Sequence, residues 1–66
     1  SVYVADAFNH RIQEFTSEGV FVSKWGTEGR GYGEFNIPTG VATASDGSVY
    51  VADMLNKRIQ KFSVGP

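Results

Sequence analysis

The chain contains no cysteine and only one histidine, His10. Without cysteine there is no disulfide framework, and a single imidazole cannot build a Cys/His zinc site. No apolar run approaches the length of a membrane span, and six basic against seven acidic side chains leave a net charge of −1. Charge therefore indicates neither nucleic-acid binding nor an acidic tail. We expect a soluble, folded piece with no metal, no cofactor and no membrane partner, and the compartment stays open.

Helical periodicity is also missing. Apolar residues never recur at i, i+3, i+4 and i+7, and eight glycines interrupt the windows in which they could. Short β-branched and aromatic runs bounded by Asp, Gly and Ser predict an all-β chain instead. The predicted strands are 2–6, 10–16, 20–25, 40–44, 48–53 and 57–63. Gly19 and Gly47 are predicted to take positive φ in hairpin turns, and the Gly-rich segment 26–38 to connect two sheets.

The chain contains an internal repeat. Residues 1–19 read SVYVADAFNHRIQEFTSEG and residues 48–66 read SVYVADMLNKRIQKFSVGP, sharing eleven of nineteen residues at an offset of 47. A period of that length is typical of four-stranded propeller blades and of helical HEAT or armadillo units. Because the repeat reads as strands, the first architecture is favoured.

The chain resembles NHL-repeat β-propellers. The residues that carry the resemblance are 40–42, 46–53 and 56–62, together with 9–15, 19–22, 24–26, 33–36 and Pro38. The resemblance implies four-stranded antiparallel propeller-blade units. It places strands two to four of one blade at 1–25, an inter-blade link at 26–39, and strands one to three of the next blade at 40–66. A propeller needs about 4 to 8 blades, and the chain opens at Ser1 inside a predicted strand. We therefore expect an excised or engineered fragment whose partners are copies of itself or neighbouring blades.

Matched polar residues recur in both copies of the repeat. They are Asp6, Asn9 and Arg11 in the first copy and Asp53, Asn56 and Arg58 in the second. A polar site is one interpretation, but recurrence favours a structural turn in which Asn tolerates the left-handed conformation and Arg bridges to a carboxylate or carbonyl.

Single residues of note are interpreted in the same way. His10 lacks metal-binding partners, which favours an exposed turn residue over a ligand or general base. Tyr3 and Tyr50 are predicted in the core, with their hydroxyls reaching polar partners. Trp25 is predicted to anchor packing at a strand end.

The predicted function is a non-enzymatic structural and interaction scaffold. The resemblance places seven residues on one rim, where inter-blade packing is favoured over binding of a protein or peptide: Phe8, His10, Arg30, Tyr32, Met54, Leu55 and Lys57. One alternative is an RNA-binding NHL module, although a single arginine in the Gly-rich segment is far short of the charge that drives RNA affinity. The other is a fragment of an amidating-lyase-like propeller enzyme, whose metal-coordinating histidines this chain cannot match.

Overall fold

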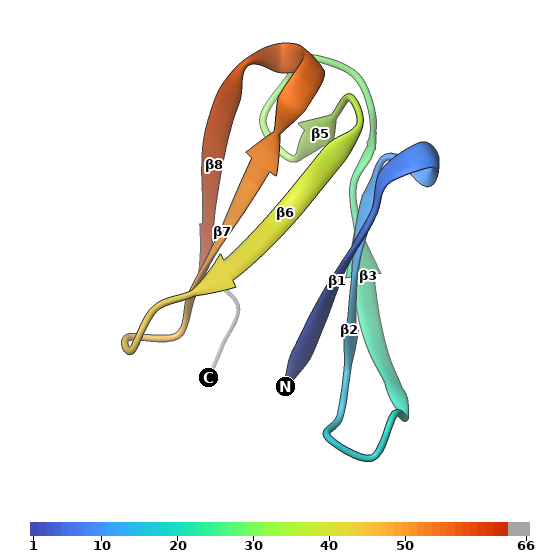
Figure 1. The fold of residues 1–66 in the computed structure, drawn as a ribbon, viewed down its shortest axis with the longest axis vertical. Coiled ribbons are helices and arrows are strands. Elements are labelled where there is room, and N and C mark those ends of the chain that lie inside the picture. The colour runs from blue at the N-terminus through green and yellow to red at the C-terminus, as the bar shows by residue number, and fades with distance from the viewer. Residues whose placement is uncertain (64–66) are drawn as a thin grey trace.

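The computed structural model describes residues 1–63, most of which form two three-stranded antiparallel sheets (Figure 1). The first sheet has the order β1-β2-β3 and the second β6-β7-β8, so each is a meander of hairpins. Their strands are β1 Val2–Asp6, β2 Arg11–Phe15, β3 Phe21–Trp25, β6 Pro38–Thr43, β7 Ser48–Asp53 and β8 Arg58–Ser63. The all-β class is confirmed, and only the last three residues of the predicted segment 40–66 lie outside the described part.

Two kinds of turn close the hairpins. A one-turn 3₁₀ helix, η1 Ala7–Asn9 or η2 Met54–Asn56, joins the first two strands of each copy. The residue after each takes the left-handed conformation, His10 at φ 53° and Lys57 at φ 56°, so the prediction of that conformation at Asn9 and Asn56 is wrong. The predicted positive φ of the hairpin glycines is confirmed, at 88° for Gly19 and 90° for Gly47. No helix within residues 1–63 is long and apolar enough to cross a membrane.

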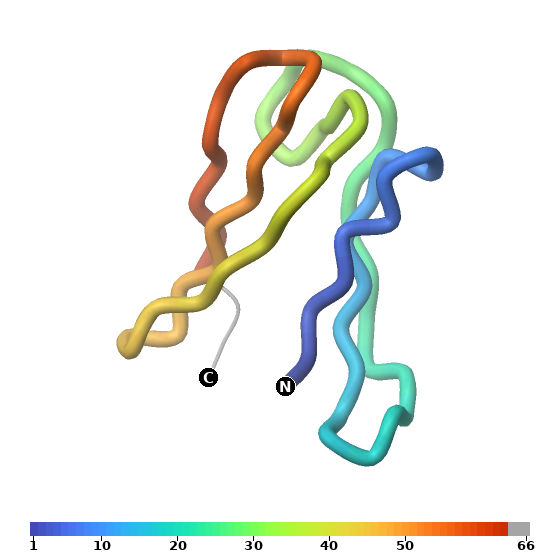
Figure 2. The backbone as a smooth tube through the Cα atoms, viewed as in Figure 1, coloured from blue at the N-terminus to red at the C-terminus, as the bar shows by residue number. Residues whose placement is uncertain are grey.

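The segment between the sheets, residues 26–37, is called the link below. Figure 2 follows it from the end of β3 over the upper end of the molecule to β6. It connects two sheets as predicted, but it also contains a short parallel pair, β4 Thr27–Glu28 and β5 Glu34–Phe35, that the sequence did not indicate. Gly26 has a φ of 111°, and a Cβ there would lie 2.6 Å from the Phe35 ring and 2.9 Å from the His10 carbonyl oxygen. The position therefore requires glycine.

The core lies between the two sheets. Ile12 of β2, Phe35 of the link, and Val49 and Val51 of β7 are all 0% exposed. Aromatic rings surround them in tilted and edge-on contacts, with centroids 5.5 Å apart for Trp25 and Phe62 and 5.7 Å for Phe35 and Phe62. The link thus contributes a core side chain, and Trp25 anchors packing as predicted.

The two equivalent tyrosines differ in burial. Tyr3 is partly buried against the core and its hydroxyl donates a long hydrogen bond of 3.4 Å to Glu14 Oε2. Burial, reinforced by the nearby Glu14 charge, raises the pKa of Tyr3. Tyr50 is 37% exposed within residues 1–63, so the prediction that it lies in the core is wrong. The reason is that the two sheets turn unlike faces toward each other.

Candidate functional site

The polar turn of the second copy surrounds a buried carboxylate. Asp53 ends β7, is 0% exposed, and pairs in register with Arg58 at the start of β8. Its Oδ2 accepts hydrogen bonds from Arg58 Nε at 2.9 Å and Asn56 Nδ2 at 2.9 Å, and its Oδ1 accepts one from the Asn36 N–H at 2.7 Å. Burial raises the pKa of Asp53, but these hydrogen bonds outweigh it and the net pKa is lowered. The carboxylate is therefore held ionised.

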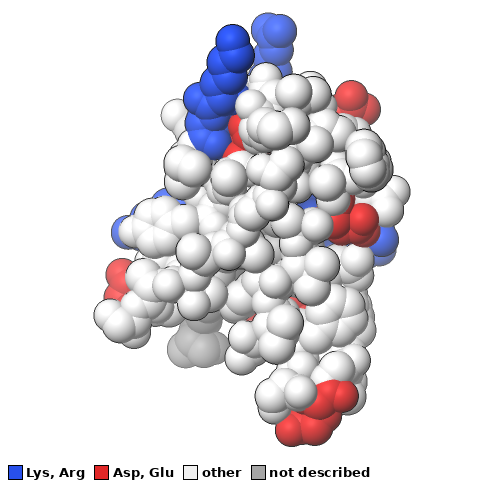
Figure 3. All heavy atoms as spheres, in the orientation of Figure 1, with Lys and Arg blue, Asp and Glu red and all other residues white. Residues whose placement is uncertain are grey.

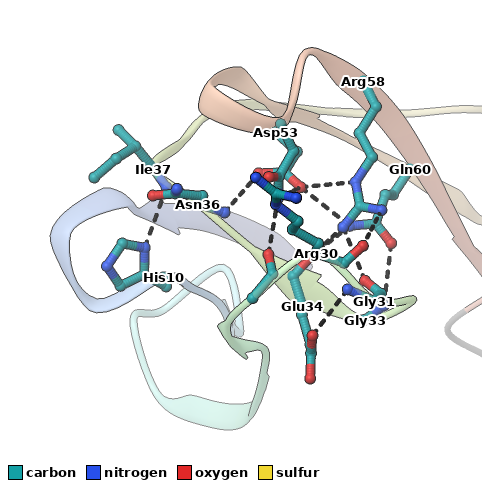
Figure 4. Close-up of polar contacts among 12 residues, drawn as sticks. His10, Arg30, Gly31, Gly33, Glu34, Asn36, Ile37, Asp53, Arg58 and Gln60 are labelled. Carbon is teal, nitrogen blue, oxygen red and sulfur yellow. Dashed lines mark hydrogen bonds and ion pairs between the residues drawn. The ribbon is translucent and has the colours of Figure 1, made fainter.

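The same turn binds the backbone of the link (Figure 4). Arg58 Nη1 donates to the Arg30 carbonyl at 2.7 Å, and Nη2 donates to the carbonyls of Gly31 and Glu34 at 2.8 Å each. Gln60 donates to the Glu34 carbonyl at 2.7 Å and accepts from the Gly33 N–H at 3.1 Å, while Asn56 donates to the Gly29 carbonyl at 2.8 Å. We call the four side chains that make these contacts the second clamp: Asp53, Asn56, Arg58 and Gln60.

The first copy has the same four side chains, which we call the first clamp: Asp6, Asn9, Arg11 and Gln13. Arg11 Nε donates to Asp6 Oδ2 at 2.8 Å, and Gln13 Nε2 donates to the same oxygen at 3.1 Å. Asn9 Nδ2 lies 3.1 Å from both Asp6 oxygens. Hydrogen bonds from Arg11 and then Asn9 lower the pKa of Asp6. The arginine bridge is present in both copies, and the purely structural role of these residues stays a prediction.

His10 is fixed by the link. Its side chain is 17% exposed, its Nδ1 accepts a hydrogen bond of 3.1 Å from the Ile37 N–H, and its Nε2 lies 3.9 Å from Glu28 Oε1. The prediction of an exposed turn residue is therefore wrong, because the link folds back over the ring. No group of three or more His, Asp or Glu side chains that could hold a metal ion occurs among residues 1–63.

The link is strained where the two turns hold it. Ile37 has a φ of 56°, a conformation that a β-branched residue adopts at a cost of about 1–3 kcal/mol. Its N–H is bound by His10, its carbonyl accepts from Met54 N at 3.4 Å, and the neighbouring Asn36 carbonyl accepts from Leu55 N at 3.1 Å. Contacts from both η turns thus impose the strain.

The predicted rim residues lie at one end of the molecule, where η1, η2 and the link come together (Figure 1). Tyr32 is 100% exposed and Phe8 87%, and Met54 and Leu55 are about half exposed. Arg30, Leu55, Asn56 and Arg58 line a pocket there. Figure 3 shows two basic side chains projecting beyond this end. The rim therefore presents exposed apolar side chains together with the exposed Arg30 and Lys57, whereas His10 is mostly buried. Its binding role stays a prediction.

The outward faces of the two sheets carry apolar side chains that are uncovered within residues 1–63. Val2 and Val4 are 49% and 42% exposed on the first sheet, whereas their equivalents Val49 and Val51 are 0% exposed. Ile59 is 64% exposed on the second sheet, whereas its equivalent Ile12 is 0% exposed. Each exposed face is therefore a copy of the face that is buried between the sheets.

The class defined by these features is an all-β repeat of antiparallel hairpin sheets. The family model for the NHL repeat matches residues 35–62, from Phe35 in β5 to Phe62 in β8. This match confirms the resemblance of that part of the chain to an NHL repeat. No match was found among curated proteins.

Proposed function

We propose that this chain is a non-enzymatic scaffold of β-propeller type, whose sheets stack on copies of itself or on neighbouring blades of a longer propeller. In this proposal β1–β3 are strands two to four of one blade and β6–β8 are strands one to three of the next. The observation that carries it is the equivalence of exposed and buried faces. Val4 and Ile59 are exposed, and their repeat equivalents Val51 and Ile12 are fully buried against each other's sheet.

Stacking through unlike faces has a consequence for assembly. A head-to-tail contact leaves one exposed face of each kind at the two ends of any stack, and this is removed when the stack closes into a ring. Fully burying an aliphatic side chain such as Ile59 is worth about 1.5–3 kcal/mol. The outer face around it supplies further apolar surface from Gly40, Ala42, Tyr50 and Ala52.

Sedimentation velocity and native mass spectrometry test the proposal. At micromolar concentration we expect a defined multiple of 7.2 kDa, and Ile59→Lys, which places a charge on the outer face, should reduce it to the monomer. Val20→Lys is the matched control, because Val20 is equally exposed at 61% but lies in the turn before β3. A folded wild-type monomer, or dissociation by both variants alike, would contradict self-assembly.

The interaction role of this scaffold is assigned to the rim. Support comes from Phe8 and Tyr32, large aromatic side chains that are 87% and 100% exposed and that lie on turns which the repeat does not need for its core. Exposed aromatic side chains are typical anchors for a protein or peptide. The partner class favoured here is therefore a polypeptide.

A further inference from the structure

The two clamps have the same types of side chain and the same arginine–aspartate bond, but they differ in what they hold. Arg58 uses all three of its donor nitrogens, one on Asp53 and two on link carbonyls. Arg11 uses only Nε, on Asp6, within residues 1–63. The exposed fraction of the carboxylate side chain follows this difference, at 24% for Asp6 and 0% for Asp53.

The unused groups of the first clamp define what would fill it. The second clamp shows what each free group would bind. The two Nη groups of Arg11 correspond to those of Arg58 and would donate to backbone carbonyls, as would the side-chain amides of Asn9 and Gln13. The Gln13 Oε1 atom would accept a hydrogen bond from a backbone N–H, as Gln60 Oε1 does. Asp6 Oδ1 is bonded by Asn9, whereas Asp53 Oδ1 accepts a link N–H. When a segment binds the first clamp, a small rotation of the Asn9 side chain would leave Asp6 Oδ1 to accept a backbone N–H from that segment.

The segment held by the second clamp favours glycine, above all at Gly33, whose φ of 78° is a conformation that L side chains rarely adopt and whose N–H is bound by Gln60. A Cβ on Gly29 would collide with the Glu34 carboxylate, and one on Gly31 would lie 3.0 Å from Glu34 Oε1. Phe35 follows and packs its ring 5.7 Å from that of Phe62. The equivalents of Val49, Val51 and Phe62 in the first copy are Val2, Val4 and Phe15, and both valines are about half exposed.

We infer that the first clamp is a binding site for a glycine-containing extended polypeptide segment, with the chemistry of residues 29–35 and supplied by another polypeptide. The four polar side chains bind its backbone, and the exposed face carrying Val2 and Val4 receives its aromatic side chain. The face carrying Val2 and Val4 is also the face on which a neighbouring sheet would stack, so the inference rests on the proposed function in this respect and is tested on the Ile59→Lys variant as well as on the wild-type chain.

The test is a titration of the intact chain with a synthetic peptide of residues 26–38, followed by nuclear magnetic resonance of the side-chain N–H groups. Saturable shifts are expected at Arg11 Nε and at the amides of Asn9 and Gln13. Signals from the second clamp should stay in place, because its own link occupies it. The single substitutions Arg11→Met and Gln13→Met should each lower the affinity for the peptide at least tenfold. Two variants are used so that the test still stands if one of them does not fold.

Two matched controls separate this site from general attraction. Lys24→Met removes a neighbouring cation, since Lys24 pairs with Gln13 in register, and it should leave peptide affinity unchanged. A peptide with Gly33→Val should not bind, because a β-branched residue is strained at the positive φ that this position requires. Absence of saturable shifts at millimolar peptide, equal binding by Arg11→Met and Gln13→Met, or equal binding of the valine peptide would overturn the inference. If the chain is monomeric and still binds the peptide, self-assembly is wrong and the inferred peptide site stands.

Discussion

The two copies of the repeat share eleven of nineteen residues but differ in what surrounds them. Both form a hairpin with a one-turn 3₁₀ helix, a left-handed residue after it, and an arginine–aspartate pair of 2.8 or 2.9 Å. Yet Val51 is 0% exposed where Val4 is 42%, and Ile12 is 0% where Ile59 is 64%. Local geometry therefore follows the residues of the hairpin, whereas burial follows what packs against it.

The arginine–aspartate pair also has a different environment in each copy. Asp53 and Arg58 hold the link, and their hydrogen bonds compensate the burial of the carboxylate. Asp6 and Arg11 make the same pair at the surface, where a solvated ion pair contributes little to stability. The same types of side chain thus bind the link in the second copy, whereas in the first copy both Nη groups of Arg11 make no hydrogen bond within residues 1–63.

Breaking the second clamp should have the largest effect. Arg58→Met removes three bonds to link carbonyls and leaves Asp53 buried without its cation, which costs about 3–5 kcal/mol. This is a large share of the stability of a domain of this size, at about 0.1 kcal/mol per residue. Urea denaturation should show it as a lower midpoint. Arg11→Met should cost clearly less, because the ion pair that it breaks is partly solvated. Equal losses would show that the clamps do not differ.

The next largest effect concerns the two equivalent isoleucines. Ile12→Ala creates a cavity in the core and should cost about 2–5 kcal/mol at any protein concentration. Ile59→Ala should cost more at high concentration than at low, because its side chain is buried only in the assembly. Thermal unfolding over a hundredfold range of concentration measures both. A concentration-independent cost for Ile59→Ala would argue against stacking on the outer face.

The pH dependence of stability should come mainly from the second clamp. The pKa of Asp53 is lower in the folded state than in the unfolded chain, so its contribution is present above about pH 4 and is lost as pH falls through the folded pKa. Asp53→Asn should flatten the acid limb of the free energy of unfolding, measured by urea titration between pH 7 and pH 3. Asp6→Asn should flatten it less, because salt and water screen the exposed pair. An equal effect of the two variants would remove the contrast.

The smallest effect is expected at the rim. Replacing Phe8, Met54 and Leu55 together by Ser should leave the circular-dichroism spectrum and the mass of the assembly unchanged, because all three are about half exposed or more. Loss of the assembly would instead assign these side chains to packing between blades and remove the main support for a binding rim.

Most of the strands follow from the sequence because their signals are local. Alternating Val and Tyr at 2–4 and 49–51 and the glycines at 19 and 47 specify strands and turns without knowledge of the rest of the chain. The conformation of His10 and Lys57 was missed because neither residue type signals positive φ strongly. The pair β4 and β5 was missed because two residues carry no periodicity.

The site was less predictable because its contacts span the sequence. Arg58 reaches Arg30, and His10 reaches Ile37, 28 and 27 residues away. No local pattern distinguishes Arg58 from Arg11 or Tyr50 from Tyr3, since only the position of the link differs. The four glycines of the segment 26–38 were the one available signal, because glycine there permits backbone to approach side chains closely.

Cysteine cross-linking tests most directly the central claim that sheets stack through unlike faces. The chain has no native cysteine, so Val4→Cys and Ile59→Cys report on one face each. The account predicts that an oxidised equimolar mixture gives the mixed disulfide dimer well above either homodimer, as Val51 and Ile12 share one core. Homodimers as abundant as the mixed species, or no cross-link in a folded sample, would contradict it.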